Sequence, residues 1–471
     1  MRTARLIWLL GSVVLGGAPL GCAVKQPPSP ADALAGVLPG TTAVPPEWTA
    51  TAGADGAVIT EWLSTFQDAQ LEGLVDEALK NNLDLAAAAA RVDGAAALAT
   101  AARALLYPHL TATGLAGVVS RDGSTRDRSG SVLDVAWELD LWGRVRAAGA
   151  SAEAVRDATA ADALSARQSL AALVATSWYQ TIATERLRAT AITAASVYED
   201  LLRLVQARKD VGQVGAQDVA LAGADLDRAR ERERAFAASL QEIMRGLEVL
   251  VGRYPAAELR LAPDMPPVPA PIPDGLPSEL LERRPDLVAA ERRVASAFHA
   301  VQSAKAARLP RFTLTAGGGR SSGELIRLIG AGAGFWRAGI EVFAPLFLGG
   351  ALQAQVRFAT ADQEASLALF GQAALRAFSE VESSLGNEPL LADQQRNLEG
   401  VLAQDTEALR LGRLRYEAGA TDLLHVLEIQ KRVLDSQFAL VEIRNDRLAN
   451  RIALHLALGG GFTTPALTVQ P

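Results

Sequence analysis

The chain is poor in the residues from which disulfides, metal sites and many catalytic sites are built. Its 471 residues include one cysteine and four histidines, and no two of these histidines have metal-ligand spacing. A single cysteine also excludes a disulfide within the chain. The 46 Lys and Arg against 53 Asp and Glu give a net charge of −7, which is not the basic balance of a nucleic-acid-binding protein. The composition predicts no metal, no cofactor and no nucleic-acid partner.

A phosphate-binding loop is missing as well. The glycine-rich stretches at 317–319 and 330–334 lack the Lys-Ser/Thr pair of a P-loop. Both lie beside predicted strands, so we expect surface turns there. Without a phosphate loop, a metal cluster or a nucleophile paired with a base, the sequence predicts a protein that is not an enzyme.

The N-terminal residues have the pattern of an export signal. Two arginines precede the apolar residues 6–15, and small residues follow up to Cys22. This segment is too short for a membrane anchor. The lone cysteine stands where a bacterial lipoprotein signal places its lipidated residue, although Pro19 occupies the usual leucine position. Lipidation of Cys22 is therefore predicted, with a conventional signal peptide as the alternative, and either case predicts export.

The remaining sequence repeats internally. Asp84 and Arg91 recur 202 positions later as Asp286 and Arg293, and Gly252 recurs 207 positions later at 459. A proline-rich stretch separates the two halves. The predicted divisions are a signal peptide at 1–21, an extended anchored segment at 22–62, a first repeat at 63–254, a linker at 255–277, a second repeat at 278–460 and a tail at 461–471.

Each half contains two stretches with the alternation of β-strands. Apolar Leu133 and Val135 alternate with acidic positions, and Trp336 and Ile340 alternate with charged ones. Strands of about ten residues with one apolar and one polar face are typical of a membrane barrel. The positions predicted to face the barrel lumen are Asp134, Glu138, Asp140, Arg337 and Glu341.

The acidic members of this set would disfavour anions, although simple solvation of a wet face is the alternative. Aromatic residues near the strand ends are predicted to lie at the membrane interfaces, with ordinary packing as the alternative. They are Trp137, Trp142, Phe312, Trp336 and Phe347. Four strands cannot close a barrel, and an open edge is not tolerated in lipid. The pattern therefore predicts an oligomer of unspecified number.

The rest of each half is helical in pattern. Residues 145–206 and 350–412 are rich in Ala, Leu, Gln and Arg, and such a run is about 90 Å long if continuous. Apolar residues from Leu424 onward step by three and four, the spacing of a coiled-coil seam. Glycines at 252 and 459 are good helix ends. A soluble bundle would account for the helices but not for the strands and the signal.

Three segments resemble one known family. Residues 280–287 (LLERRPDL) resemble the hallmark segment of outer-membrane efflux lipoproteins, residues 137–144 resemble their strand-to-helix turn, and Tyr416–Gly419 resembles the bend between their inner helices. The resemblance extends from about residue 60 to 460. The chain is identified as a member of the TolC-like family, in the NodT-like or OprM-like lipoprotein branch of resistance-nodulation-division (RND) efflux systems.

The resemblance implies a mainly α fold with a membrane β-barrel part. Three chains of four strands would form a twelve-stranded barrel on a periplasmic coiled-coil tunnel. The homotrimer would sit in outer-membrane lipid, lipid-anchored and extending into the periplasm. It would receive small molecules from a periplasmic adaptor (membrane fusion) protein and an inner-membrane RND pump, as a passive gated conduit. An outlet for type I protein secretion and a non-channel helical scaffold lipoprotein are the alternatives.

The resemblance also maps a periplasmic gate onto 208–222 and 412–428. His425 departs from the family pattern, which usually has Asp there. A histidine can make closure pH-sensitive, or it can be an ordinary polar residue on a coiled-coil surface. The residues predicted to form the gate are Asp218, Tyr416, His425 and Glu428.

Overall fold

The computed structural model describes residues 25–39, 44–50, 61–121, 124–261, 264–273, 275, 277–322 and 333–460. Cys22, the signal segment and the tail at 461–471 lie outside the described residues.

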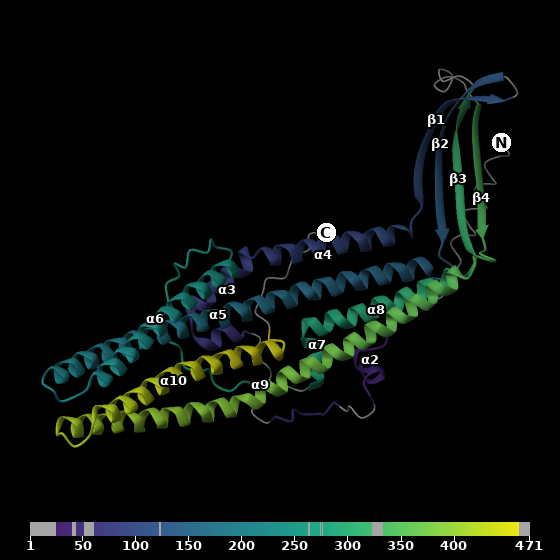
Figure 1. Ribbon diagram of the computed structural model, residues 1–471. Coiled ribbons are helices and arrows are strands. Elements are labelled where there is room, and N and C mark those ends of the chain that lie inside the picture. Colours follow the sequence, from purple (N-terminus) through teal and green to yellow (C-terminus); the bar gives the residue numbers. More distant parts are fainter. Residues whose placement is uncertain are drawn as a thin grey trace. The chain divides into compact units, whose positions relative to one another are not determined.

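Long helices make up most of the described chain, and four strands that alternate with them in the sequence form one sheet (Figure 1). The strands are β1 (His109–Arg121), β2 (Ser124–Leu139), β3 (Arg311–Ser322) and β4 (Ala333–Phe343). The helices are α2 (Pro30–Val37), η1 (Trp62–Phe66), α3 (Ala69–Asn81), α4 (Leu83–Ala104), α5 (Arg144–Asp210), α6 (Ala216–Leu250), η2 (Pro277–Glu279), α7 (Leu280–Arg283), α8 (Pro285–Ala306), α9 (Ala351–Glu417) and α10 (Leu423–Ala457).

Corresponding helices in the two halves have the same length. Helices α4 and α8 each contain 22 residues, α5 and α9 each contain 67, and α6 and α10 each contain 35. In each half, the 22-residue helix is followed by two strands and then by the 67- and 35-residue helices. The predicted fold class, mainly helical with four strands per chain, is confirmed.

Helix ends follow local sequence signals. Asp422 caps α10 by accepting a hydrogen bond from the backbone N–H of His425 at 2.9 Å. At the opposite ends, Gly252 and Gly459 follow α6 and α10 with φ of 81° and 70°. Glycine adopts this left-handed conformation without steric penalty, as predicted for these two positions.

One helix continues through a proline. Pro389 lies inside α9, although proline lacks the N–H that would bond to the carbonyl of Leu385. On the same turn, the Asn450 side-chain amide donates to the Ser384 carbonyl at 3.0 Å. This hydrogen bond joins α10 to α9 one residue before the interrupted carbonyl of Leu385.

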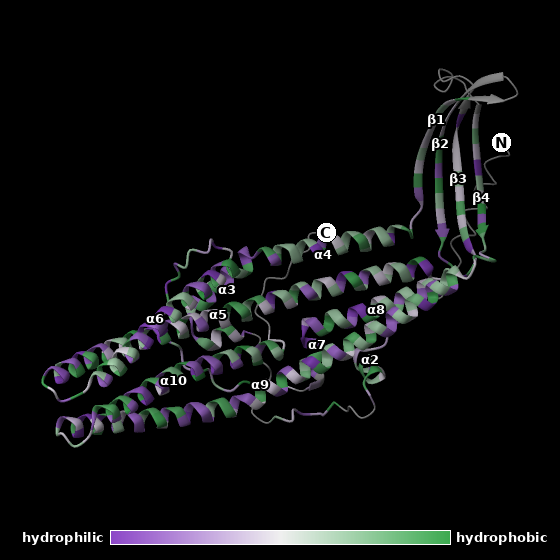
Figure 2. Ribbon diagram, in the orientation of Figure 1, coloured by the Kyte–Doolittle hydropathy of each residue, from purple (hydrophilic) through white to green (hydrophobic). Residues whose placement is uncertain are grey.

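The four strands pair antiparallel in the order β1-β2-β3-β4. Residues directly opposite one another share a face of the sheet, so the register separates two sets of side chains. The strand ribbons in Figure 2 carry both hydrophobic and hydrophilic residues along their length. The apolar face carries Leu110, Leu133, Val135, Trp137, Leu139, Phe312, Leu314, Trp336, Ile340 and Val342. The polar face carries Thr111, Thr113, Asp134, Glu138, Thr313, Thr315, Gly317, Arg337 and Glu341.

The chain forms two compact units, each taking segments from both halves. One unit comprises Met1–Pro39, Ala90–Ala161 and Ala289–Gln372 and contains the sheet. The other comprises Gly40–Ala89, Asp162–Val288 and Ala373–Pro471. An extensive apolar core in the second unit includes Trp62 and Trp178, both almost fully buried. The Trp178 indole N–H donates to Asp68 at 2.8 Å, so its one polar atom is satisfied in this core.

Candidate functional site

Two acids on the polar face of the sheet, Asp134 and Glu138, are each paired with an arginine. Arg337 Nη2 lies 2.7 Å from Asp134 Oδ1. Arg144 binds Glu138 through two contacts, Nε to Oε1 at 3.0 Å and Nη2 to Oε2 at 2.8 Å. Because these pairs neutralise the acids, the expectation that they disfavour anions is not supported by the charge balance. Glu341 is exposed on this face, with no charged partner among the described side chains.

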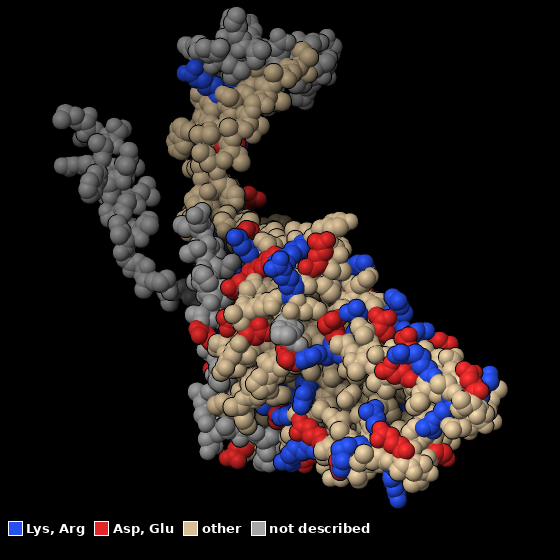
Figure 3. Space-filling view, turned by 90° about the vertical axis from the view of Figure 1, so that its left-hand side faces the viewer, with Lys and Arg blue, Asp and Glu red and all other residues tan. Residues whose placement is uncertain are grey.

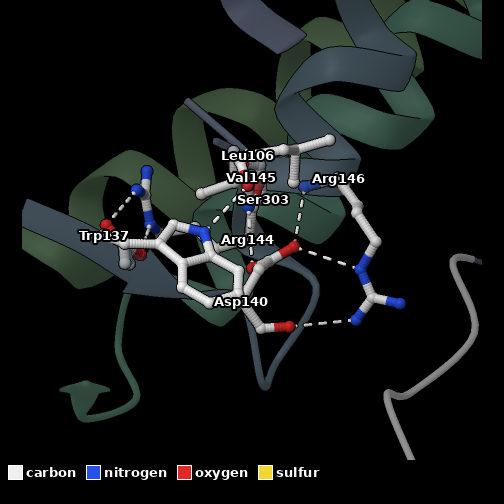
Figure 4. Close-up of polar contacts among 8 residues, drawn as sticks. Leu106, Trp137, Asp140, Arg144, Val145, Arg146 and Ser303 are labelled. Carbon is white, nitrogen blue, oxygen red and sulfur yellow. Dashed lines mark hydrogen bonds and ion pairs between the residues drawn. The ribbon is translucent and has the colours of Figure 1, made fainter. Parts of the chain in front are cut away.

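Asp140 is displaced from its predicted place. Strand β2 ends at Leu139, so the prediction that Asp140 belongs to the polar face of the strand is wrong by one residue. Its carboxylate accepts from the backbone N–H groups of Val145 at 3.0 Å and Arg146 at 2.8 Å (Figure 4). The Arg146 side chain also pairs with it at 3.1 Å. Asp140 therefore caps the first turn of α5, where the free N–H groups and the helix dipole favour a carboxylate.

Two of the tryptophans predicted at the membrane interface donate hydrogen bonds to backbone carbonyls just before a strand. The Trp137 indole N–H donates to the Leu106 carbonyl at 2.8 Å, just before β1 (Figure 4). The Trp142 indole N–H donates to the Pro310 carbonyl at 2.7 Å, just before β3. Trp336 is 83% exposed and Phe347, which follows β4, is 87% exposed. Phe312 is half-buried.

Charged side chains are distributed unevenly over the chain. In Figure 3 the helical part shows Lys and Arg mixed with Asp and Glu, whereas the described part of the sheet is mostly uncharged. This contrast agrees with the apolar face identified from the register. A sheet surface of this kind suits hydrocarbon, whereas the mixed surface of the helices suits water.

The turns that join α5 to α6 and α9 to α10 have the same geometry. Gly212 and Gly419 both adopt positive φ, 75° and 73°. The Gly212 N–H donates to the backbone carbonyl of Lys209 at 2.9 Å, and the Gly419 N–H donates to that of Tyr416 at 3.0 Å. These two turns are the segments to which the predicted gate was assigned.

A cavity of about 670 Å³ lies between the two turns. Asp218 and Asp422 both line it, together with leucine side chains. Each aspartate also accepts a backbone hydrogen bond at the start of its own helix, from Gly215 and His425 respectively, both at 2.9 Å. The carboxylates therefore have a structural task in addition to facing the cavity.

Tyr416 is buried and does not line this cavity. Its ring packs with Val426 and Ile429, and the guanidinium carbon of Arg208 lies 4.0 Å above the ring centroid. Its hydroxyl has no hydrogen-bond partner among the described residues. Burial raises the pKa of Tyr416, and the Arg208 charge opposes that shift.

The four predicted gate residues do not form one cluster. Asp218 lines the cavity, Tyr416 lies under Arg208, and the side chains of His425 and Glu428 are exposed. Arg208 and Asp422 lie within the two segments assigned to the gate, but the sequence analysis did not single them out. The spacing of Asp422 before the leucine-rich helix is an N-cap signal that could have identified it, whereas nothing local marks Arg208.

The outer membrane efflux protein family matches this chain over residues 74–253 and 276–460. The chain belongs to this family. It is 33% identical over 441 residues to the pyoverdine export outer membrane protein OpmQ of Pseudomonas aeruginosa, covering 89% of this chain and 92% of that protein. It is 29% identical over 429 residues to the probable efflux pump outer membrane protein TtgC of Pseudomonas putida, covering 88% of each.

A solved structure of the outer-membrane channel OprN superimposes with a TM-score of 0.83 at 28% identity, covering 90% of this chain and 98% of that one. The chain therefore has the TolC-like fold and is an outer-membrane efflux channel subunit, as the three sequence segments predicted.

Proposed function

We propose that three copies of this chain close one twelve-stranded barrel and form a gated exit conduit. The observation that carries this proposal is the open sheet, in which β1 and β4 are unpaired edges among the described residues and one face is apolar. Unpaired backbone groups are not tolerated in lipid, so each edge must pair with another copy. The number three follows from the family resemblance.

Exposed apolar helix surface also supports assembly. Helix α4 is long and apolar enough to cross a membrane by length and composition, yet only 6% of its most apolar window is buried within the chain. Leu83 and Leu98 on this helix are 81% and 70% exposed. Packing against neighbouring copies would cover them in the trimer.

The proposed cargo is small and toxic to the cell. The relatives named above serve pyoverdine export and an efflux pump, and neither name refers to protein secretion. We expect the conduit to receive its cargo from a periplasmic adaptor and an inner-membrane RND pump. We also propose that Cys22 is lipidated and that the chain consists of two repeats, at 63–254 and 278–460.

The proposed gate closes through Arg208 and Tyr416. Their stacked contact joins the end of α5 to the end of α9, the two helices that must separate if these turns are to move apart. A cation over an aromatic ring contributes roughly 0.5–1 kcal/mol at exposed sites and more when desolvated. Asp218, His425 and Glu428 complete the constriction in this proposal as polar side chains near the same turns.

Planar-bilayer conductance together with native mass tests the proposal. We expect a trimer with small conductance that rises when Arg208 or Tyr416 is replaced by Ala. Arg410→Ala is the matched control, because Arg410 is an exposed arginine of α9 paired with Glu407, and it should conduct like the parent chain. A monomer that never conducts would refute the barrel, and equal conductance in all variants would refute only the gate.

A further inference from the structure

The Asp134–Arg337 ion pair spans two strands that are not neighbours. Asp134 lies on β2 opposite Gly317 of β3, and Gly317 lies opposite Arg337 of β4. Neighbouring strands are about 4.8 Å apart, so the backbones of the two charged residues are separated by roughly twice that distance. Their side chains nevertheless meet at 2.7 Å, and they do so by passing over β3.

Gly317 leaves the space in which the pair lies. A Cβ atom built on Gly317 would be 3.3 Å from Arg337 Nε and 3.3 Å from Asp134 Cγ, and closer still to Asp134 Oδ1. Any side chain at this position would displace one or both partners. Glycine inside a strand normally weakens the strand, and here it accommodates a close approach of charged groups.

We propose that this pair, seated over Gly317, determines the ion selectivity of the barrel. It holds one positive and one negative charge at the same level of the polar face, so that at this level the wall favours solutes of neither sign. The inference rests on the proposed function, in which the polar face lines the lumen. It names Asp134 and Arg337 as specificity-determining residues whose charges can be removed one at a time.

The dimensions of the barrel determine when such charges matter. Twelve tilted strands give a radius of about 12 Å. The Debye length is about 30 Å in 0.01 M salt and about 3 Å in 1 M salt. In dilute salt, removal of one partner adds three unbalanced charges, one per chain, whose field reaches across the lumen. In concentrated salt the same charges are screened.

Reversal potentials in a gradient of dilute potassium chloride test this inference on the full-length trimer. Asp134→Asn should shift selectivity toward anions and Arg337→Gln toward cations, each by on the order of threefold in permeability ratio. The double variant has balanced charge again and should return to the parental value. Arg337→Lys keeps the charge and should leave the selectivity unchanged. Both single-variant shifts should shrink in 1 M salt.

Conducting single variants with the parental reversal potential would overturn the inference, as would a double variant that keeps the shift of either single one. These outcomes leave the channel itself intact. A parent chain that does not conduct would instead refute the proposed function and the inference with it.

Discussion

In each half of the chain, a side chain donates a hydrogen bond to the carbonyl of the last residue of the final helix. The two halves use different side chains for this contact. In the first half, the Asn82 amide donates to the Leu250 carbonyl at the end of α6, at 3.0 Å. In the second half, the Arg284 guanidinium donates to the Ala457 carbonyl at the end of α10, at 3.2 Å. These are equivalent positions in the repeat.

The difference lies in what else each side chain binds. Asn82 also accepts from the backbone N–H of Asp84 at 2.9 Å and so caps α4. Arg284 instead pairs with Asp286 at 2.8 Å and Glu380 at 2.6 Å. The backbone arrangement is shared by both halves, whereas the side chains that satisfy it differ. The second half relies on charge where the first relies on a neutral amide.

The largest expected effect comes from removing Arg284. Its side chain is only 10% exposed, so Arg284→Ala would leave Asp286, Glu380 and the Ala457 carbonyl without their partner. We expect a loss of about 3 kcal/mol in the free energy of unfolding, since both acids are partly exposed. Asn82→Ala should lose only about 1–2 kcal/mol. Urea unfolding in detergent, followed by circular dichroism, would measure both, and equal losses would contradict the proposed asymmetry.

Both halves have a glycine in the left-handed conformation just after their final helix. Gly252 and Gly459 adopt positive φ, and a Cβ would lie 2.9 Å from Asn81 Cβ in the first case and 3.2 Å from the Arg283 carbonyl carbon in the second. Alanine at either position should lower stability by about 2 kcal/mol. The same unfolding assay applies. Gly400→Ala is the control, because that glycine lies inside α9 with open space around it, and a similar loss there would argue against the close-approach explanation.

A third comparison involves two buried polar residues at equivalent repeat positions. Glu248 accepts from the backbone N–H groups of Ala257 at 2.6 Å and Glu258 at 2.8 Å. His455 is fully buried and stacks on Trp62 with ring centroids 5.5 Å apart. Neither of its ring nitrogens has a hydrogen-bond partner among the described residues. Burial, with a smaller effect of the Arg451 charge, lowers the pKa of His455 to about 3.

This pKa shift predicts acid sensitivity. Below about pH 6.5, His455 takes up a proton in the unfolded chain but not in the folded one. The free energy of unfolding therefore decreases as the pH is lowered from about 6.5 to about 3. One unit below pH 6.5 the loss is about 1.4 kcal/mol at most. His455→Phe should reduce this dependence of stability on pH. Unfolding would be measured at about pH 7.5 and about pH 5.5, which lie one unit above and below the ordinary histidine pKa. An identical pH dependence in parent and variant would rule out His455 as its source.

The smallest effect is expected at His425. Its side chain is exposed, and the hydrogen bond to Asp422 involves only its backbone N–H. His425→Gln should change stability by less than about 0.5 kcal/mol. The conductance of parent and variant should respond alike to mildly acidic and neutral pH. A response lost in the variant would restore the pH-sensitive gate suggested by the sequence.

The features predicted well depend on neighbours along the chain. The apolar alternation in β2 and β4 and the helix-ending glycines were all visible in short windows. The errors and omissions involve residues brought together from afar or at a boundary. Asp140 lies one residue beyond its strand, and the contact of Arg208 with Tyr416 joins positions more than two hundred residues apart.

By itself the sequence determined the element types, the repeat and the family, because periodicity, caps and motifs act over a few residues. Only the tertiary structure decided which charges neutralise each other. Asp134 and Arg337 meet because the strand register aligns them across a glycine. Ion pairing depends on the distance between side chains in space, and no local pattern in the sequence specifies that distance.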